Sequence, residues 1–226
     1  MTYQLLTFDL DGTLADTAGE IAEAANRTIE ELGFERRPVV EITNLIGRGT
    51  RELMAKLMAA ISHEQPSRQF DEHDVLRRFE RHYGDTTGTM ATLFEGCKEG
   101  LDRLRAAGVP MACVTNKEHR FAMRVLQATG LLPYFGLVVG GDSLPEKKPH
   151  PSMIGHCFNV LGGWPEVCAH VGDSHIDVAT AHAAGVSAWA VPYGYNGGEP
   201  IESAGPHQVF PSIAAIADHV LALREA

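Results

Sequence analysis

Apolar and polar residues follow two alternating patterns along the chain. Short continuous apolar runs, which are typical of buried strands, cover residues 4–9, 110–115, 137–140, 168–172 and 188–192. Stretches with apolar residues at helical spacing lie between or after these runs, at 99–107, 118–129, 152–161, 176–184 and 212–223. Such alternation is typical of βαβ units. We therefore predict an α/β fold whose core is a doubly wound, Rossmann-like parallel sheet.

The pattern changes between residues 15 and 92, where helical spacing continues and no strand is predicted. Thr17 and Glu20 have the spacing of a capping box, and Gly33 is expected to end the first helix. Further helical spacing occurs at 51–60 and 75–83. We predict an all-helical cap, residues 15–92, inserted after the first strand of a core formed by residues 1–14 and 93–226. Residues 84–90 are mostly small and polar, which predicts a linker outside the packed core.

The composition narrows the class of function. The chain has 226 residues and a formal net charge of −10, with Lys and Arg scattered singly. We therefore expect no nucleic-acid partner and no membrane partner. No apolar stretch is long enough to span a bilayer and no basic leader segment is present, so we expect a cytoplasmic protein. The four cysteines lack C-x-x-C spacing, which favours free thiols over a disulfide framework.

Polar side chains follow three of the predicted strands. Asp9 and Asp11 end the first strand, Thr115 and Asn116 end the second, and Asp173 follows the fourth. Ligands bind at the carboxyl ends of the strands in open parallel sheets. We therefore expect these side chains to converge on one site.

Asp9 and Asp11 are the strongest candidates for chemistry. Two carboxylates beside an apolar strand repel each other and lose hydration, and a divalent cation would offset that cost. With Asp9 ionised at such a cation, Asp11 can carry a proton, which predicts a nucleophile next to a general acid. The alternative is an ordinary turn rich in Asp and Gly.

Three further positions support this site, each with a structural alternative. Thr115 can hold phosphate oxygens, or it can cap the helix that follows. A lysine of the segment Lys147-Lys148-Pro-His-Pro can balance clustered carboxylates and a phosphoryl group, or it can be a solvated charge. Spacing does not decide which lysine points inward. Asp173 can ligate Mg²⁺ with Asp177 supporting a bound water or the lysine, or the segment can be a capped helix start.

Arg48 is the candidate for substrate contact in the cap. It lies between glycines in Gly47-Arg48-Gly49, and a cap arginine can bind a substrate carboxylate or phosphate with two parallel hydrogen bonds. The alternative is a flexible turn with an exposed arginine. The 11 histidines form no zinc pattern, and neither a G-x-S-x-G elbow nor a G-x-x-x-x-G-K-[ST] phosphate loop is present.

Four segments together resemble the motifs of the haloacid dehalogenase superfamily of phosphatases. In chain order they are Asp9-Leu-Asp-Gly-Thr, Thr115-Asn-Lys, Lys148-Pro-His-Pro and Gly172-Asp-Ser-His-Ile-Asp. The resemblance implies that Asp9 attacks phosphorus to form an aspartyl-phosphate and that Asp11 protonates the leaving oxygen, then activates water. It also selects Lys148 over Lys147, because the family's lysine immediately precedes the proline.

The same resemblance assigns ligands and supporting residues. Mg²⁺ would be held by Asp9, the backbone carbonyl of Asp11, and Asp173. The phosphoryl group would be bound by Thr115, Asn116 and Lys148. Ser174 and Asp177 would act indirectly, by stabilising the positions of the metal and of Lys148.

Within the superfamily, the chain is similar to bacterial phosphoglycolate phosphatases. The similar segments are the helical cap, Ile46-Gly-Arg-Gly, Gly140-Gly-Asp-Ser-Leu and Tyr193-Gly-Tyr-Asn-Gly-Gly-Glu. This implies hydrolysis of a small phosphorylated metabolite, 2-phosphoglycolate, by a monomer or homodimer. Two alternatives use the same core: a sugar-phosphate phosphatase, for example for N-acetylmuramic acid 6-phosphate, and a phosphohexose mutase. A phosphate-binding protein without activity is a third alternative, although every catalytic position carries its expected residue.

Overall fold

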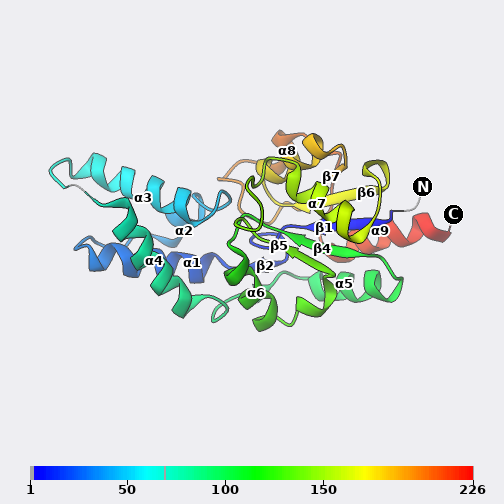
Figure 1. Cartoon of the computed structure of the whole chain (residues 1–226), viewed down its shortest axis with the longest axis horizontal. Helices are drawn as coiled ribbons and strands as arrows, with labels where there is room; N and C mark the ends of the chain where they lie inside the picture. The colour runs from blue at the N-terminus through cyan, green and yellow to red at the C-terminus, as the bar shows by residue number, and fades with distance from the viewer. Residues whose placement is uncertain (1–2, 69, 226) are drawn as a thin grey trace.

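Six parallel strands in the order β5-β4-β1-β6-β7-β8 form the central sheet of the computed structural model (Figure 1), which describes residues 3–68 and 70–225. The strands are β1 Leu5–Phe8, β4 Met111–Val114, β5 Leu137–Val139, β6 Cys168–Gly172, β7 Ser187–Ala190 and β8 Gln208–Val209. The first five of these match the predicted apolar runs. Strand β8 was not predicted, because two residues are too few to form a pattern.

Helices cover both faces of this sheet. They are α5 Cys97–Ala106, α6 His119–Ala128, α7 Ser152–Leu161, α8 His175–Ala184 and α9 Ile213–Glu225, with 3-10 turns η1 Leu132–Tyr134, η2 Pro165–Val167 and η3 Ile201–Ala204. Successive strand residues point to opposite faces, so Leu6 packs in the cluster with α5, α6 and α9, and Leu5 in the cluster with α7 and α8. This two-sided sheet confirms the predicted fold class.

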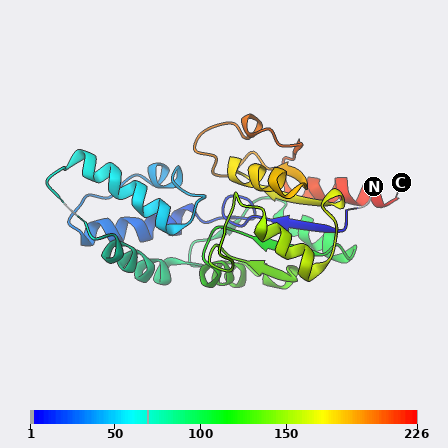
Figure 2. The same ribbon diagram turned by 45° about the horizontal axis from the view of Figure 1, so that its top comes forward.

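The cap consists of four helices that share a separate hydrophobic cluster. They are α1 Ala18–Glu31, α2 Val39–Thr43, α3 Thr50–Glu64 and α4 Glu72–Thr86. Figures 1 and 2 show the cap lying beyond one end of the sheet, away from the two termini. A two-stranded antiparallel ribbon, β2 Ala15–Asp16 with β3 Thr92–Leu93, joins it to the core. The prediction of an insertion without strands missed this ribbon, because its strands have only two residues each.

Two local predictions in the cap were wrong. Thr17 does not bond the first turn of α1 with its side chain, and its hydroxyl instead donates to Asp11. Glu20 is fully buried and accepts a hydrogen bond from the backbone N–H of Gly88. The predicted linker is partly packed, since α4 continues through Thr86, whose buried hydroxyl donates to the backbone of Glu20, although Asp85, Thr89 and Met90 are exposed. Small polar residues enter a core when backbone groups satisfy their hydroxyls.

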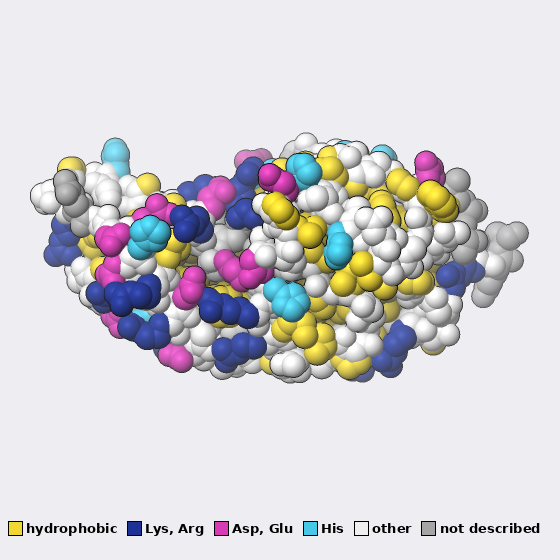
Figure 3. All heavy atoms as spheres, in the orientation of Figure 1, with side chains coloured by type: hydrophobic (Ala, Val, Ile, Leu, Met, Phe, Trp, Pro, Cys, Tyr) yellow, Lys and Arg dark blue, Asp and Glu magenta, His cyan; other side chains and the backbone are white. Residues whose placement is uncertain are grey.

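The domain ranges remain a prediction, and their residues 1–2, 69 and 226 lie outside the described part of the chain. All four cysteines are free, as predicted, and all four are buried. Within residues 3–68 and 70–225, no helix combines the length and apolarity that crossing a membrane requires. On the face shown in Figure 3, Lys and Arg side chains are interspersed with Asp and Glu, mainly over the cap and its junction with the core.

Candidate active site

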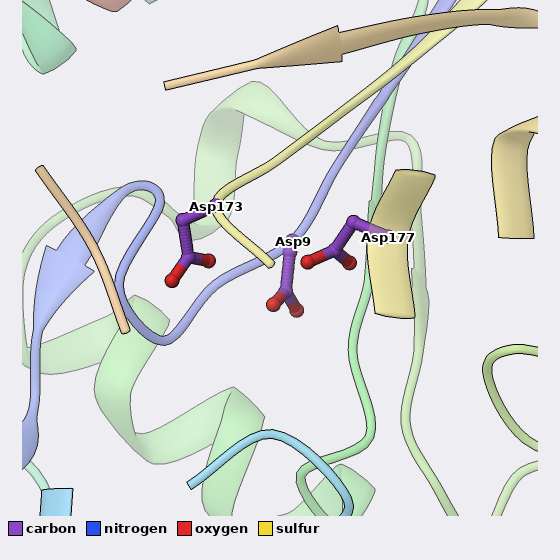
Figure 4. A group of neighbouring side chains, drawn as sticks. All are labelled: Asp9, Asp173 and Asp177. Carbon is purple, nitrogen blue, oxygen red and sulfur yellow. The ribbon is translucent and has the colours of Figure 1, made fainter. Parts of the chain in front are cut away.

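Three carboxylates meet at the carboxyl end of the sheet (Figure 4). Asp9 directly follows β1, Asp173 follows the neighbouring strand β6, and Asp177 lies in the first turn of α8. One oxygen of each lies within 4.8 Å of the others. The register that pairs Phe8 with Val171 brings the strand ends together, as expected from the sequence.

Lys148 is buried among these acids. Its Nζ lies 2.8 Å from Asp9 Oδ1 and 2.7 Å from Asp177 Oδ1, and it also donates to the carbonyl of Val114. Burial alone would lower the pKa of Lys148, but Asp177 and Asp9 raise it above its ordinary value. The structure therefore brings Lys148 to the carboxylates, whereas the Nζ of Lys147 donates to the carbonyl of Arg48 at 2.5 Å.

Asp177 is held by several donors. Its Oδ1 faces Lys148 and the His170 ring, and its Oδ2 accepts from the Ser174 hydroxyl at 2.5 Å and the Ser174 N–H at 3.2 Å. Burial would raise the pKa of Asp177, but Lys148 and His170 hold it well below its usual range. Asp177 thus both caps α8 and positions Lys148. The helix-cap interpretation and the lysine-supporting interpretation of Asp177 are therefore compatible. The buried His170, which also bonds Thr7, gave no sequence signal beyond its place in a strand.

The electrostatics of the other two acids favour a bound cation. Burial raises the pKa of Asp9 to about 6, partly offset by Lys148, and burial with the charges of Asp177 and Asp9 raises the pKa of Asp173 well above its ordinary value. One buried lysine therefore compensates three buried acids incompletely. Hard carboxylate oxygens are the ligands that Mg²⁺ and Ca²⁺ prefer. The cluster can hold such a metal ion.

Asp173 is fixed by two residues that the sequence-based assignment missed. The Thr13 hydroxyl donates to Oδ1 at 2.7 Å, and the backbone N–H of Tyr195 donates to Oδ2 at 2.5 Å. The backbone approaches so closely that a Cβ at Gly12 or Gly194 would overlap the Asp173 side chain. In the sequence, the segment Tyr193-Gly-Tyr indicated only a resemblance to the family and assigned no role to Tyr195.

Asp11 is not part of this three-acid cluster. Its Oδ1 accepts hydrogen bonds from the Thr17 hydroxyl at 2.6 Å and from Lys117 Nζ at 2.9 Å. Lys117 is buried and also donates to the hydroxyl of Tyr83, which belongs to α4 of the cap. Lys117 had been noted only as the residue after Thr115 and Asn116, and nothing in the sequence links it to Tyr83.

Thr115 and Asn116 lie in the loop after β4. The helix that follows is capped at Glu118, so Thr115 is not its N-cap. The Asn116 side-chain amide donates to the carbonyls of Gly47, in the cap, and Lys148, in the core. Asn116 thereby connects the cap turn to the loop that carries the catalytic lysine candidate.

A cavity of about 30 Å³ lies between cap and core beside these residues. The core lines it with Asp11, Thr115, Asn116 and Lys117, and the cap lines it with Ile21, Ile46, Gly47, Gly49, Thr50, Leu53 and Tyr83. Arg48 is not among the lining residues. Its Nε lies 3.6 Å from Glu52, and its side chain is 40% exposed. The structure therefore does not bring the guanidinium of Arg48 to the other predicted site residues.

Comparisons with known proteins cover nearly the whole chain. Residues 6–191 match the family described as haloacid dehalogenase-like hydrolase. The chain is 40% identical over 209 residues to a phosphoglycolate phosphatase of Nitrosospira multiformis, covering 91% of this chain and 90% of the relative. It is 41% identical over 189 residues to a plasmid phosphoglycolate phosphatase of Cupriavidus necator, covering 84% and 80%. The crystal structure of a predicted phosphoglycolate phosphatase from Haemophilus somnus superposes with a TM-score of 0.88 at 30% identity, covering 97% and 98%.

Proposed function

Because the chain belongs to the haloacid dehalogenase-like hydrolase family and is a phosphoric monoester hydrolase, we propose that it hydrolyses 2-phosphoglycolate to glycolate and phosphate. The observation that carries the chemistry is Asp9 at 2.8 Å from the buried Lys148, within the three-acid cluster. The names of the relatives at 40% and 41% identity support the substrate.

We propose Mg²⁺ as the metal, held by Asp9, the backbone carbonyl of Asp11, and Asp173. When bound, it would neutralise charge at the phosphoryl oxygens and at the clustered carboxylates. Asp177 is assigned a supporting role because its Oδ1 lies 2.7 Å from Lys148 Nζ and its Oδ2 caps the start of α8. Ser174 supports it through the start of α8.

The proposed reaction has two steps on Asp9. In the first, a carboxylate oxygen of Asp9 bonds to phosphorus, the bond from phosphorus to the leaving oxygen breaks, and Asp11 gives that oxygen a proton. In the second, Asp11 takes a proton from water as the water oxygen attacks phosphorus, and the bond to Asp9 breaks. Thr115, Asn116 and Lys148 bind the phosphoryl oxygens.

The cap is proposed to exclude water and choose the substrate. The small cavity beside Asp11 is consistent with this, because 30 Å³ holds only about two or three water-sized groups. A sugar phosphate, including N-acetylmuramic acid 6-phosphate, or a phosphohexose in a mutase reaction would need a displaced cap. We keep residues 15–92 as the cap and residues 1–14 with 93–226 as the core. A cytoplasmic monomer or homodimer without nucleic-acid or membrane partners completes the proposal.

A phosphate-release assay with Mg²⁺ tests the proposal. The panel contains 2-phosphoglycolate, N-acetylmuramic acid 6-phosphate, hexose 6-phosphates and p-nitrophenyl phosphate, and ³¹P NMR of a hexose 1-phosphate detects mutase turnover. We expect the largest kcat/KM on 2-phosphoglycolate. A larger value on a sugar phosphate, or isomerisation faster than phosphate release, would contradict it.

A further inference from the structure

Lys117 is a buried cation to which the phosphoryl chemistry assigns no task. Its side chain is 2% exposed, and it lines the cavity between cap and core. Burial would lower the pKa of Lys117, but Asp11 and Tyr83 raise it above its ordinary value. A charge kept this far from water needs partners.

Apart from the Thr115 hydroxyl, which accepts from the Lys117 N–H and is assigned to the phosphoryl group, two side-chain hydrogen-bond donors at this cavity lack an acceptor within residues 3–68 and 70–225. An ammonium group has three donors, and Lys117 uses one on Asp11 Oδ1 and one on the Tyr83 hydroxyl. The Tyr83 hydroxyl accepts from Lys117, and its own proton has no acceptor in that part of the chain. Both groups are buried and both line the same cavity. Two unpaired donors side by side fit the two oxygens of one carboxylate.

The rest of the cavity matches a short leaving group. Its cap wall includes the apolar side chains of Ile21, Ile46 and Leu53, which offer no competing acceptor. Glu20 does not line the cavity: its Oε2 accepts from the backbone N–H of Gly88, and its buried Oε1 has no partner in the part of the chain that the structure describes. The cavity is therefore small, and its lining includes unpaired donors on Lys117 and Tyr83 together with the Asn116 side chain, whose Oδ1 has no partner within the described residues.

We infer that Lys117 Nζ and the Tyr83 hydroxyl bind the carboxylate of the leaving group and are the specificity-determining pair of this phosphatase. This rests on the proposed function, and it names the substrate class as short phosphate monoesters whose leaving group ends in a carboxylate. Because Lys117 belongs to the core and Tyr83 to the cap, the carboxylate is bound by both only when the cap is docked. A neutral leaving group leaves the two donors unpaired in a buried site, which disfavours it.

The test compares 2-phosphoglycolate with its amide, which keeps the size and removes the charge. We measure kcat/KM on both esters, with Mg²⁺, for the full-length wild type, Lys117→Met, Tyr83→Phe and Arg48→Ala. Lys98→Met is the matched control, because Lys98 is exposed and pairs with Asp102 away from the cavity. Competitive inhibition by glycolate, against p-nitrophenyl phosphate, reports carboxylate binding separately from turnover of the carboxylated ester.

We expect Lys117→Met to lower the ratio of the two kcat/KM values by about 10- to 100-fold, since hydrogen bonds to charged groups have that weight. Tyr83→Phe should lower it by about 3- to 10-fold and weaken glycolate inhibition. If Lys117→Met does not fold, the Tyr83→Phe result decides. Lys98→Met should leave the ratio unchanged.

Three outcomes would overturn the inference. One is an equal loss on both esters in Lys117→Met, which would mean that Lys117 acts only through Asp11. Another is an unchanged ratio with unchanged glycolate inhibition in Tyr83→Phe. The third is a fall of the ratio in Arg48→Ala alone, which would assign the carboxylate to the arginine. Failure of the proposed function is separate, because it appears as slow wild-type hydrolysis of 2-phosphoglycolate relative to the sugar phosphates.

Discussion

The surroundings of the two buried lysines, Lys148 and Lys117, differ in where their partners come from. Lys148 contacts Asp9, Asp177 and the Val114 carbonyl, all of which belong to the core. Lys117 contacts Asp11, from the core, and Tyr83, from the cap. The Lys148 region can therefore keep its contacts whatever the cap does, whereas the Lys117 region is complete only while the cap is docked.

This difference separates chemistry from specificity. In the proposed mechanism, groups around Lys148 act on the phosphoryl end that every phosphate monoester shares, so changes there should affect all substrates alike. By the further inference, Lys117 and the cap wall contact the leaving group, so changes there should depend on the substrate. Each prediction below tests one side of this division.

Asp9→Asn should have the largest effect. An amide is a poor nucleophile, so phosphate release should fall by about four orders of magnitude or more on every ester. Circular dichroism should show that the fold is retained. The control is Asp218→Asn at an exposed position on α9, which should keep full activity. Normal turnover by Asp9→Asn would remove the central claim of the mechanism.

Lys148→Met should have the second-largest effect on phosphate release. It removes the cation that lies between Asp9 and Asp177, and unpaired buried charge costs roughly 3–5 kcal/mol of stability in the metal-free protein. Phosphate release should fall by about 10³-fold on carboxylated and neutral esters alike. Lys147→Met is the matched control, since within the described residues its Nζ donates a hydrogen bond to the Arg48 carbonyl and not to an acid of the cluster. A loss of activity on the carboxylated ester alone would contradict the assignment of Lys148 to the phosphoryl group and of Lys117 to the leaving group.

Removing the metal should make stability depend on pH through Asp9 and Asp173. Both have folded-state pKa values raised above the unfolded ones, so the folded state binds the proton more tightly. Stability is then greatest below about pH 4 for this pair and falls as pH rises through about 6. For Asp9 alone the change is about 3 kcal/mol.

Thermal unfolding in EDTA across pH 4–7 measures this dependence. Mg²⁺ should reduce the slope, and Asp9→Asn should remove the share due to Asp9. Other groups, including the histidines, also titrate in this range, so the difference between wild type and Asp9→Asn is the quantity to compare. An identical slope of stability against pH in both proteins would show that the pKa of Asp9 is not raised in the metal-free protein.

Tyr195→Phe should have the smallest effect, at the junction of the two regions. The hydroxyl accepts from the N–H groups of Thr17 and Ala18 at the start of α1 and donates to Asp16, while the backbone N–H holds Asp173. We expect a loss of about 1–2 kcal/mol in unfolding free energy and unchanged Mg²⁺ affinity. Tyr134→Phe, which loses a bond to Asp102 in the core, controls for loss of a hydroxyl. A large fall in Mg²⁺ affinity would instead mean that the Tyr195 hydroxyl supports the proposed metal site.

Much of the fold followed from periodicity, because long elements repeat their pattern several times. The predicted helix 152–161 has the bounds of α7, and the predicted strand 168–172 has those of β6. Elements of two residues, such as β8 and the ribbon of β2 with β3, contain no full period and were missed. The packed tract around Thr86 was missed for another reason, since its burial depends on a distant carbonyl in α1.

The sequence by itself determined the parallel core, the capped architecture and the meeting of Asp9, Asp173 and Lys148, because each residue stands at a strand end or in a recognisable motif. Only the tertiary structure decided what lines the cavity between cap and core. Lys117 and Tyr83 are 34 residues apart and touch because α4 packs over the loop after β4. Arg48, which the sequence analysis selected for substrate contact because of its charge, lies beside Glu52 instead. A local motif determines side chains that its own loop positions. A contact between cap and core depends instead on how two separately packed units dock.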